Sequence, residues 1–325
     1  IRMNIELVDA ELAVHLKSFP ALDIWTDLVK TRQLGAQMRA KIIGELPKIE
    51  GVESSDYLIP QADAPEVSVR VYRPENQLER LPALLWIHGG GYCLGAMESD
   101  DNVVRQIAKA VGSVIVSVEY RLAPEHPFPA ALNDCSTALQ WLADNTDTLA
   151  VDPARIAIGG ISAGAGLAAG LALYVRDKTD ITLVFQFLLC PMIDDRCVTP
   201  SSHMITDERV WNRHSNLIAW KNYLQGENDA ETAPFDDVSA YAAASRAIDL
   251  SDLPPAYIAV GSVDAFVDEN RDYAKRLETA GVATQLAVFT GGFHGFEFIA
   301  PAAEISKTAR DSHYSALRNA LFGKA

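Results

Sequence analysis

Short apolar runs alternate with helical stretches through most of this chain. Residues 83–87 form a continuous apolar run, the pattern of a strand that is covered on both faces. Further strands are predicted at 56–59, 67–72, 113–118, 155–158, 182–189, 256–260 and 285–289. Helical stretches lie between most of them, for example at 101–110 and 133–144. This alternation predicts an α/β fold with a mainly parallel, doubly wound sheet.

Two regions depart from this alternation. Residues 1–47 are predicted to be helical up to Pro47, with apolar positions in helical period at Ile24, Trp25, Leu28 and Val29. Residues 195–245 are polar and partly helical, at 210–224, without a strong strand. An insertion of this size usually forms a lid or cap. The core is therefore expected in two parts, 48–194 and 246–325.

The composition indicates a globular protein and argues against nucleic acid and anionic lipid as partners. Of the 325 residues 49% are apolar, which excludes intrinsic disorder. Lys and Arg number 28 against 43 Asp and Glu, a formal net charge of −15. Such a charge argues against nucleic-acid binding and against docking on anionic lipid.

The spacing of the cysteines and the length of the longest apolar run indicate where in the cell the protein is expected. The four cysteines form no CxxC pair and no dense framework, as expected for thiols in a reducing compartment. The longest largely apolar run, 181–193, is shorter than the roughly 20 residues that span a bilayer. The N-terminus has no basic-then-apolar signal pattern. We therefore expect a cytoplasmic protein without a membrane span.

The strongest chemical motif is Gly160-Ile161-Ser162-Ala163-Gly164, which follows a predicted strand and opens an alanine-rich helix. A serine on such a tight turn exposes its hydroxyl, and the helix N-terminus favours developing negative charge. The alternative is a glycine-rich turn that only packs helix on strand. A phosphate loop is disfavoured because no Lys-Ser or Lys-Thr follows, and a dinucleotide site is disfavoured because the strand lies deep in the chain.

A second motif, His88-Gly89-Gly90-Gly91-Tyr92, directly follows the strand at 83–87. Glycines allow backbone N–H groups to turn toward a ligand without side chains in the way. Such donors can stabilise an oxyanion. His88 is expected to brace the loop and to take no part in the chemistry.

A nucleophilic serine needs a base and an orienting acid. Of the seven histidines, only His294 lies just past the last predicted strand. Asp264 follows the preceding strand, so the order is Ser162, Asp264, His294. Asp268 is a rival acid, but it precedes a helical stretch whose first turn it can cap. An uncharged His294 is needed as base, so activity should fall below about pH 6 to 7.

These motifs resemble the hormone-sensitive-lipase-like branch (family IV) of the α/β-hydrolase esterases. The resemblance spans about residues 65 to 300. Its most specific part is the run from Tyr120 to Ala131, whose Arg121, Glu125 and His126 are expected to be structural. Besides the glycine loop and the serine turn, it rests on Cys190-Pro191-Met192-Ile193-Asp194, Leu253-Pro254-Pro255 and His294-Gly295-Phe296. Two positions depart from the family's usual motif around the serine, Ile161 and Ala165.

The resemblance implies an α/β-hydrolase fold whose helical cap combines the N-terminal helices with the insertion after the sixth strand. It implies a serine carboxylesterase that acts on small, short-acyl, uncharged esters, with no metal or organic cofactor. The implied oxyanion donors are the backbone N–H groups of Gly90, Gly91 and Ala163. It also suggests a homodimer through the last strand, 285–289.

Two rival functions stay open at this stage. A lactone or amide hydrolase would use the same triad, because the leaving group is selected by the shape of the cap and pocket. A non-catalytic receptor is the second rival, since the plant gibberellin receptor resembles this family. That receptor lacks the catalytic histidine, whereas this chain has His294.

Overall fold

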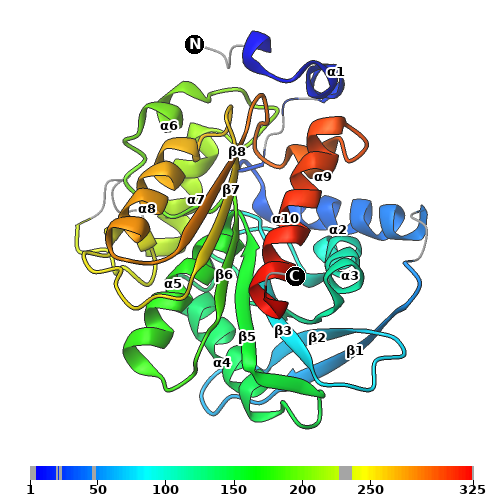
Figure 1. Cartoon of the computed structure of the whole chain (residues 1–325). Helices are drawn as coiled ribbons and strands as arrows, with labels where there is room; N and C mark the ends of the chain where they lie inside the picture. Colours follow the sequence, from blue (N-terminus) through cyan, green and yellow to red (C-terminus); the bar gives the residue numbers. More distant parts are fainter. Residues whose placement is uncertain (1–4, 20, 22–23, 46–48, 227–235, 324–325) are drawn as a thin grey trace.

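One eight-stranded sheet runs through the whole molecule (Figure 1). The computed structural model describes residues 5–19, 21, 24–45, 49–226 and 236–323. The strand order is β1-β2-β4-β3-β5-β6-β7-β8. The strands are β1 (Val52–Ile59), β2 (Val67–Pro74), β3 (Leu81–Ile87), β4 (Val114–Glu119), β5 (Val151–Ile161), β6 (Phe185–Leu189), β7 (Ala256–Gly261) and β8 (Thr284–Phe289). Every predicted strand is therefore present.

The pairing of the strands confirms the mainly parallel sheet. β1 and β2 pair antiparallel, as do β2 and β4, and the strands from β4 to β8 are parallel. β3 is buried at every position, which is why its sequence is a continuous apolar run. β8 ends the sheet and pairs only with β7 among the described strands.

Helices cover both faces of the sheet. Apolar side chains of α3 (Asp101–Ile107) and α10 (Glu304–Phe322) pack on one face. Those of α4 (Ala130–Asp144), α5 (Ala163–Lys178) and α8 (Val267–Thr279) pack on the other. Figure 1 shows the two groups on opposite sides, which is the doubly wound arrangement. The predicted helix at 101–110 continues past α3 as a π-helical turn, Ala108–Gly112.

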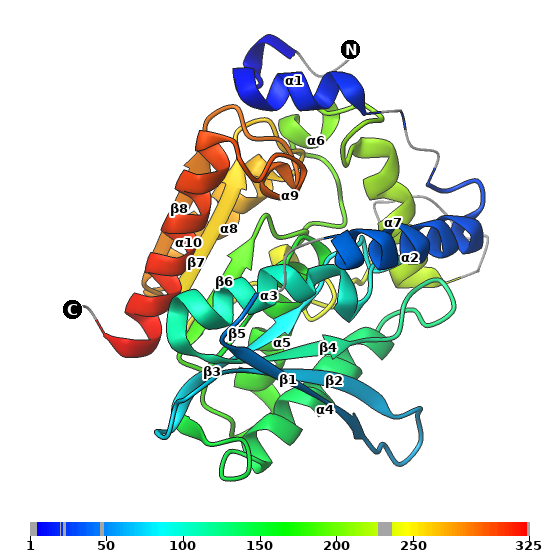
Figure 2. The ribbon, with the colours of Figure 1, turned by 90° about the vertical axis from the view of Figure 1, so that its right-hand side faces the viewer.

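Parts of the two regions that departed from the alternating pattern lie side by side in the upper half of the view in Figure 2. The first provides the short turn η1 (Ile5–Leu7), α1 (Ala10–Ser18) and α2 (Leu28–Glu45), and the second provides α6 (Pro200–Met204), α7 (Arg213–Gln225) and the turn η4 (Ala244–Arg246). The Trp25 indole N–H donates to the Ser215 hydroxyl at 3.0 Å, and Arg209 donates to the Leu16 carbonyl at 3.2 Å. Segments about 190 residues apart in sequence therefore touch directly. Within the described residues, none of the helices combines the length and apolar character needed to cross a membrane.

The prediction that Ile24 and Trp25 are helical is wrong. They precede α2, which begins at Leu28. The Asp27 carboxylate accepts a hydrogen bond from the backbone N–H of Lys30 at 2.9 Å. This cap starts the helix at Leu28, four residues after Ile24, where the apolar spacing began. Pro47, predicted to end the region, lies outside the described residues.

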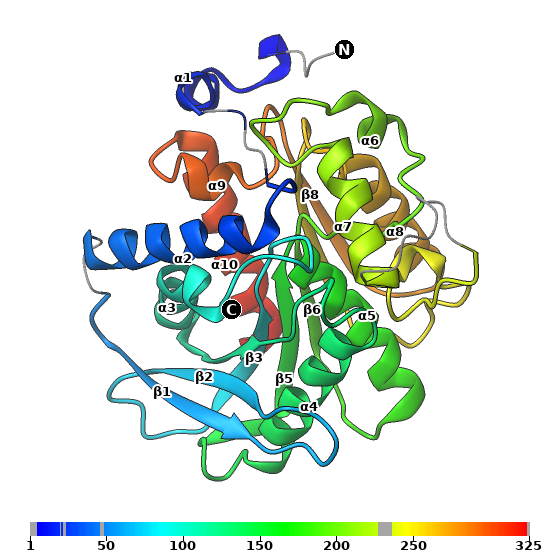
Figure 3. The ribbon, with the colours of Figure 1, turned by 180° about the vertical axis from the view of Figure 1, so that it is seen from behind.

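The structural roles expected for Arg121 and Glu125 in the run from Tyr120 to Ala131 are confirmed by their contacts with two helices. Arg121 forms a two-pronged ion pair with Asp134 of α4, with contacts of 2.7 and 2.9 Å, and the Asp134 side chain is 2% exposed. Glu125 pairs with Arg32 of α2 at 2.7 Å. Figure 3 shows α2 lying along the molecule beside α3. The run therefore has a structural role in positioning α2.

We expect Asp134→Ala to lower the free energy of unfolding by about 3 kcal/mol, because it leaves the Arg121 guanidinium without its buried partner. Urea unfolding followed by circular dichroism measures the change. The matched control is Asp147→Ala, which removes the acid of an exposed pair with Arg80 and should cost less than about 1 kcal/mol. Equal effects of the two substitutions would contradict the structural role of the Arg121–Asp134 pair.

Candidate active site

Ser162 sits on the sharp turn between β5 and α5. Its backbone φ is 56° and ψ is −120°, a conformation that non-glycine residues seldom adopt. A Cβ on Gly160 would lie 2.3 Å from the Ile87 carbonyl oxygen, and one on Gly164 would lie 2.1 Å from the same atom. Neither position has room for a side chain. The glycines therefore let α5 pack against the end of β3, and that packing holds the strained serine in place.

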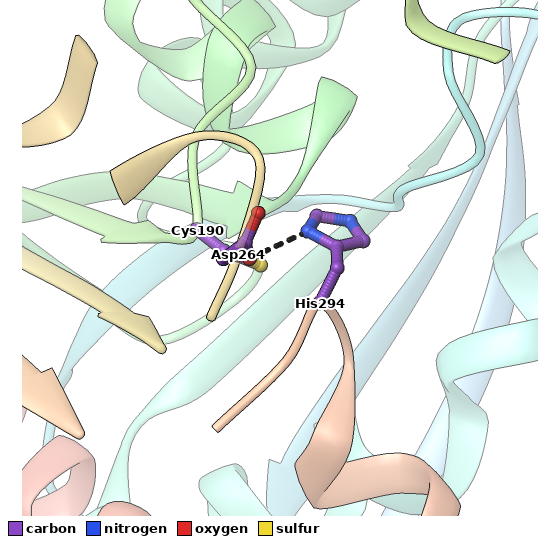
Figure 4. A group of neighbouring side chains, drawn as sticks. All are labelled: Cys190, Asp264 and His294. Atoms are coloured by element: carbon purple, nitrogen blue, oxygen red, sulfur yellow. Dashed lines mark hydrogen bonds and ion pairs between the residues drawn. The ribbon is translucent and has the colours of Figure 1, made fainter. Parts of the chain in front are cut away.

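Three side chains that are distant in sequence form a hydrogen-bonded chain at this turn. His294 Nε2 lies 2.9 Å from the Ser162 hydroxyl, and His294 Nδ1 lies 2.8 Å from Asp264 Oδ2. Asp264 comes from the loop after β7 and His294 from the loop after β8. Figure 4 shows the Asp264 carboxylate directed at the imidazole. The structure thus brings together the three residues predicted from strand order.

The two neighbouring acids after Asp264 face elsewhere. Asp268 accepts a hydrogen bond from the backbone N–H of Ser201 at 2.8 Å. The prediction that Asp268 caps its own helix α8 is therefore wrong: its carboxylate binds the first turn of α6 in the insertion. Glu269 is buried and accepts hydrogen bonds from the N–H groups of Ile193 and Asp194. Asp264 is the acid of this stretch that meets His294.

The glycine loop after β3 lies directly against the serine turn. A Cβ on Gly89 would be 3.4 Å from the Ser162 Cβ. Gly90 and Gly91 have φ values of 124° and 58°, and no backbone acceptor for their N–H groups is found among the described residues. His88 is fully buried and stacks on Tyr120, whose hydroxyl donates to the His88 carbonyl. His88 therefore braces the loop as predicted.

A cavity of about 310 Å³ opens in front of Ser162 and His294. The Trp211 ring of the insertion packs on the glycine loop so closely that a Cβ on Gly91 would lie 2.2 Å from it. The predicted site residues that line the cavity are Gly90, Gly91, Ser162 and His294, and residues not foreseen from the sequence are Ile24, Leu94, Ser99, Asp100, Trp211 and Phe298. Most of these lie in loops or in the cap regions, where no local motif marks a pocket residue.

Cys190, which follows β6, lies beside the hydrogen bond between Asp264 and His294 (Figure 4). Burial raises the pKa of its thiol. Among the described residues, these three form a group whose donor atoms are within 4.8 Å of one another, a spacing compatible with a metal ion. Two of the donors are already joined to each other by a hydrogen bond. The cluster is therefore satisfied internally.

The surroundings of His294 change its proton affinity. Burial disfavours the charged ring, but the Asp264 carboxylate and the Cys190 side chain together outweigh it, so the pKa of His294 lies above its ordinary value of 6.5. Only the uncharged ring can accept a proton from a serine hydroxyl. A raised pKa therefore leaves a larger protonated, inactive fraction at any given pH than an ordinary histidine would.

Strand order, the strained serine turn and the hydrogen-bonded Ser-His-Asp arrangement together define an α/β-hydrolase. A family model described as alpha/beta hydrolase fold matches residues 84–298, and the chain belongs to this family. The resemblance to its hormone-sensitive-lipase-like branch is confirmed.

Similar proteins are esterases. The chain is 36% identical over 243 residues to the carboxylesterase NlhH of Mycobacterium tuberculosis, an alignment that covers 73% of this chain and 74% of that protein. It is 31% identical over 268 residues to an arylesterase of Saccharolobus solfataricus, covering 82% and 83%. A solved bacterial heroin esterase has a TM-score of 0.92 and 40% identity, covering 98% of this chain and 99% of that one. This chain is a carboxylic ester hydrolase of the serine esterase type.

We expect kcat/KM for a neutral ester to fall with decreasing pH through a midpoint above 6.5, because the Asp264 carboxylate raises the pKa of His294. This shifts the acid limb upward from the pH 6 to 7 expected for an ordinary histidine. A pH series of initial rates measures the midpoint, with circular dichroism confirming that the protein stays folded. A midpoint below 6 in the folded protein would contradict the influence of Asp264 on the ring.

Proposed function

We propose that Ser162 is the nucleophile, His294 the general base and acid, and Asp264 the orienting acid of this esterase. The hydrogen-bonded chain at 2.9 and 2.8 Å supports these roles, because each atom pair has the separation that proton transfer and orientation need. The Asp264 carboxylate also accepts a hydrogen bond from the Phe266 N–H at 2.9 Å, which fixes its orientation toward the ring.

In this mechanism the Ser162 hydroxyl oxygen attacks the ester carbonyl while its proton moves to His294 Nε2. The tetrahedral intermediate collapses, and His294 returns the proton to the departing alcohol. Water then attacks the acyl-enzyme with His294 as base, which releases the acid and restores the serine. Asp264 holds the proton of the ring on Nδ1, so Nε2 is free to accept.

The proposed oxyanion donors are the backbone N–H groups of Gly90, Gly91 and Ala163. Ala163 is the first residue of α5, so its N–H belongs to the helix N-terminus, where the helix dipole favours negative charge. The positive φ values at Gly90 and Gly91 and the tight contact of Gly89 with the serine turn support the same assignment.

The proposed substrates are small, short-acyl, uncharged esters. A cavity of about 310 Å³ lies at the lower end of the size range of ligand pockets, and Ile24, Leu94 and Trp211 give it apolar walls. We assign residues 1–47 and 195–245 to the cap and 48–194 and 246–325 to the core. The contacts of Trp25 with Ser215 and Trp211 support this division.

We propose a cytoplasmic location because the four cysteines are all buried and form no disulfide. This arrangement suits a reducing compartment. The location stays a prediction.

Hydrolysis of a chromogenic short-chain ester tests the proposed roles. Ser162→Ala and His294→Ala should each lower kcat by roughly 10⁴ or more, since each removes one member of a unit that acts together. Cys190→Ala is the matched control: it changes a buried side chain next to the triad and should retain most of the turnover. Near-normal rates in the folded serine or histidine variant would overturn the mechanism.

The choice of acid is tested by Asp264→Asn against Asp268→Asn. The first should lower kcat by about 10⁴ with an intact fold, because an asparagine at 264 favours the wrong imidazole tautomer. The second should retain most activity, because an amide oxygen can still accept from the Ser201 N–H. Loss of turnover in Asp268→Asn alone, measured beside the thermal midpoints of both variants, would reverse the assignment.

We also propose a homodimer that pairs β8 with its copy across a two-fold axis. β8 is an edge strand, and its outer backbone groups are available for pairing. Multi-angle light scattering at micromolar concentrations should give twice the 35.3 kDa chain mass. A monomer mass under these conditions would remove the proposal.

A further inference from the structure

A buried acid, Asp100, lines the same cavity as Ser162 and His294. It ends the short turn η2 (Met97–Asp100) and directly precedes α3. The residue is 8% exposed. The mechanism proposed above gives this carboxyl no role, although it belongs to the wall of the pocket in which an ester would bind.

Asp100 has an incomplete set of partners. One carboxylate oxygen, Oδ2, accepts a hydrogen bond from the Trp86 indole N–H at 2.8 Å. Within the described part of the chain, no Lys, Arg or His side chain forms an ion pair with it, and its pKa responds only to burial and to Trp86. A buried carboxylate without a cationic partner is unfavourable, so a ligand that brings a positive charge gains from meeting it.

The protonation state of Asp100 follows from its surroundings. Burial raises its pKa to about 6, against which the Trp86 hydrogen bond acts. Other titratable side chains nearby are Tyr120 at the end of β4, His294 across the pocket, and the acids Glu98 and Asp101 beside it in sequence. At pH 8 the carboxyl is therefore mostly ionised, and below pH 6 it is mostly neutral.

The rest of the pocket wall suits an alkylammonium group. Ile24, Leu94, Ile161 and Phe298 provide apolar surface for methyl groups, and Trp211 adds an aromatic ring of the kind that attracts cations. The negative charge of the whole chain, −15, also attracts cations toward the cavity. No other charged side chain apart from the catalytic histidine lines this cavity among the described residues.

We propose that Asp100 is a cation-recognising residue of the substrate pocket, so that esters bearing a quaternary or protonated amine are preferred over neutral esters of the same shape. This proposal rests on the proposed function, because it names a substrate class for the same serine site. The uncharged esters proposed above remain substrates, and the Asp100 carboxylate raises kcat/KM for cationic esters of the same shape above theirs.

Pairs of esters that differ only in charge test the proposal. The first pair is the acetate ester of choline and its carbon isostere 3,3-dimethylbutyl acetate, which place the charge in the alcohol. The second is ethyl 4-(trimethylammonio)butanoate and ethyl 5,5-dimethylhexanoate, which place it in the acyl group. The measured quantity is the ratio of kcat/KM, cationic over neutral, within each pair at pH 8.

We expect Asp100→Asn to lower this ratio about tenfold in at least one pair, and the responding pair identifies the side of the ester that faces Asp100. The asparagine keeps an oxygen that can accept the Trp86 hydrogen bond. Glu98→Gln is the matched control, since it removes the same charge two residues away without lining the cavity. Its ratio should stay at the wild-type value.

The pH dependence supplies a second readout. The quaternary ammonium group does not titrate, and protonation of His294 slows both esters of a pair alike. The wild-type ratio should therefore fall toward the Asp100→Asn value as pH drops through about 6, while the variant's ratio stays flat. Unchanged ratios in Asp100→Asn for both pairs, or an equal fall in Glu98→Gln, would overturn the proposal.

A binding measurement separates this proposal from the proposed function. Calorimetry on Ser162→Ala compares choline with 3,3-dimethylbutan-1-ol, neither of which requires catalysis. Tighter binding of choline that is lost in Ser162→Ala/Asp100→Asn supports the cation site even where the proposed catalytic roles fail. Equal affinities for the two alcohols, together with unchanged kinetic ratios, reject the cation site and leave the esterase mechanism intact.

Discussion

The contact between the start of α5 and the end of β3 is the constraint on which the catalytic arrangement depends. Gly160 and Gly164 approach the Ile87 carbonyl too closely for any side chain to fit at either position. This packing holds Ser162 at a φ of 56° and places its hydroxyl beside the glycine loop that leaves β3. The proposed nucleophile and the proposed oxyanion donors are therefore positioned by one packing contact, and His294 reaches them because the parallel strands end at one edge.

Residues of the proposed cap contact the site directly. Trp211 lies against Gly91, so a movement of the insertion would alter the space around the glycine loop. Trp25 links the N-terminal segment to the same tryptophan and to Ser215, and Arg32 ties α2 to Glu125. The proposed cap and the glycine loop are thus joined by a small number of aromatic and charged contacts.

Three buried acids around the site illustrate how the surroundings decide the use of a carboxyl group. Asp264 is hydrogen-bonded to the His294 ring, and Glu269 accepts hydrogen bonds from backbone N–H groups of the loop after β6. Asp100 has one indole donor and faces the cavity. Burial raises the pKa of Glu269 well above its usual value. The incomplete environment of Asp100 is what makes it available to a ligand.

The sequence alone determined the strands, their mainly parallel arrangement and the order of Ser162, Asp264 and His294, because apolar runs and residues at strand ends are local signals. It placed the start of α2 too early, since apolar spacing does not register the Asp27 cap. It also expected the Asp268 carboxylate to cap α8, whereas that carboxylate accepts a hydrogen bond from the Ser201 N–H of α6. The partner of Asp268, the Trp211 contact with Gly91 and the position of Asp100 in the cavity were decided only by tertiary structure. Each depends on segments far apart in the chain that meet through packing, and no local pattern encodes such a meeting.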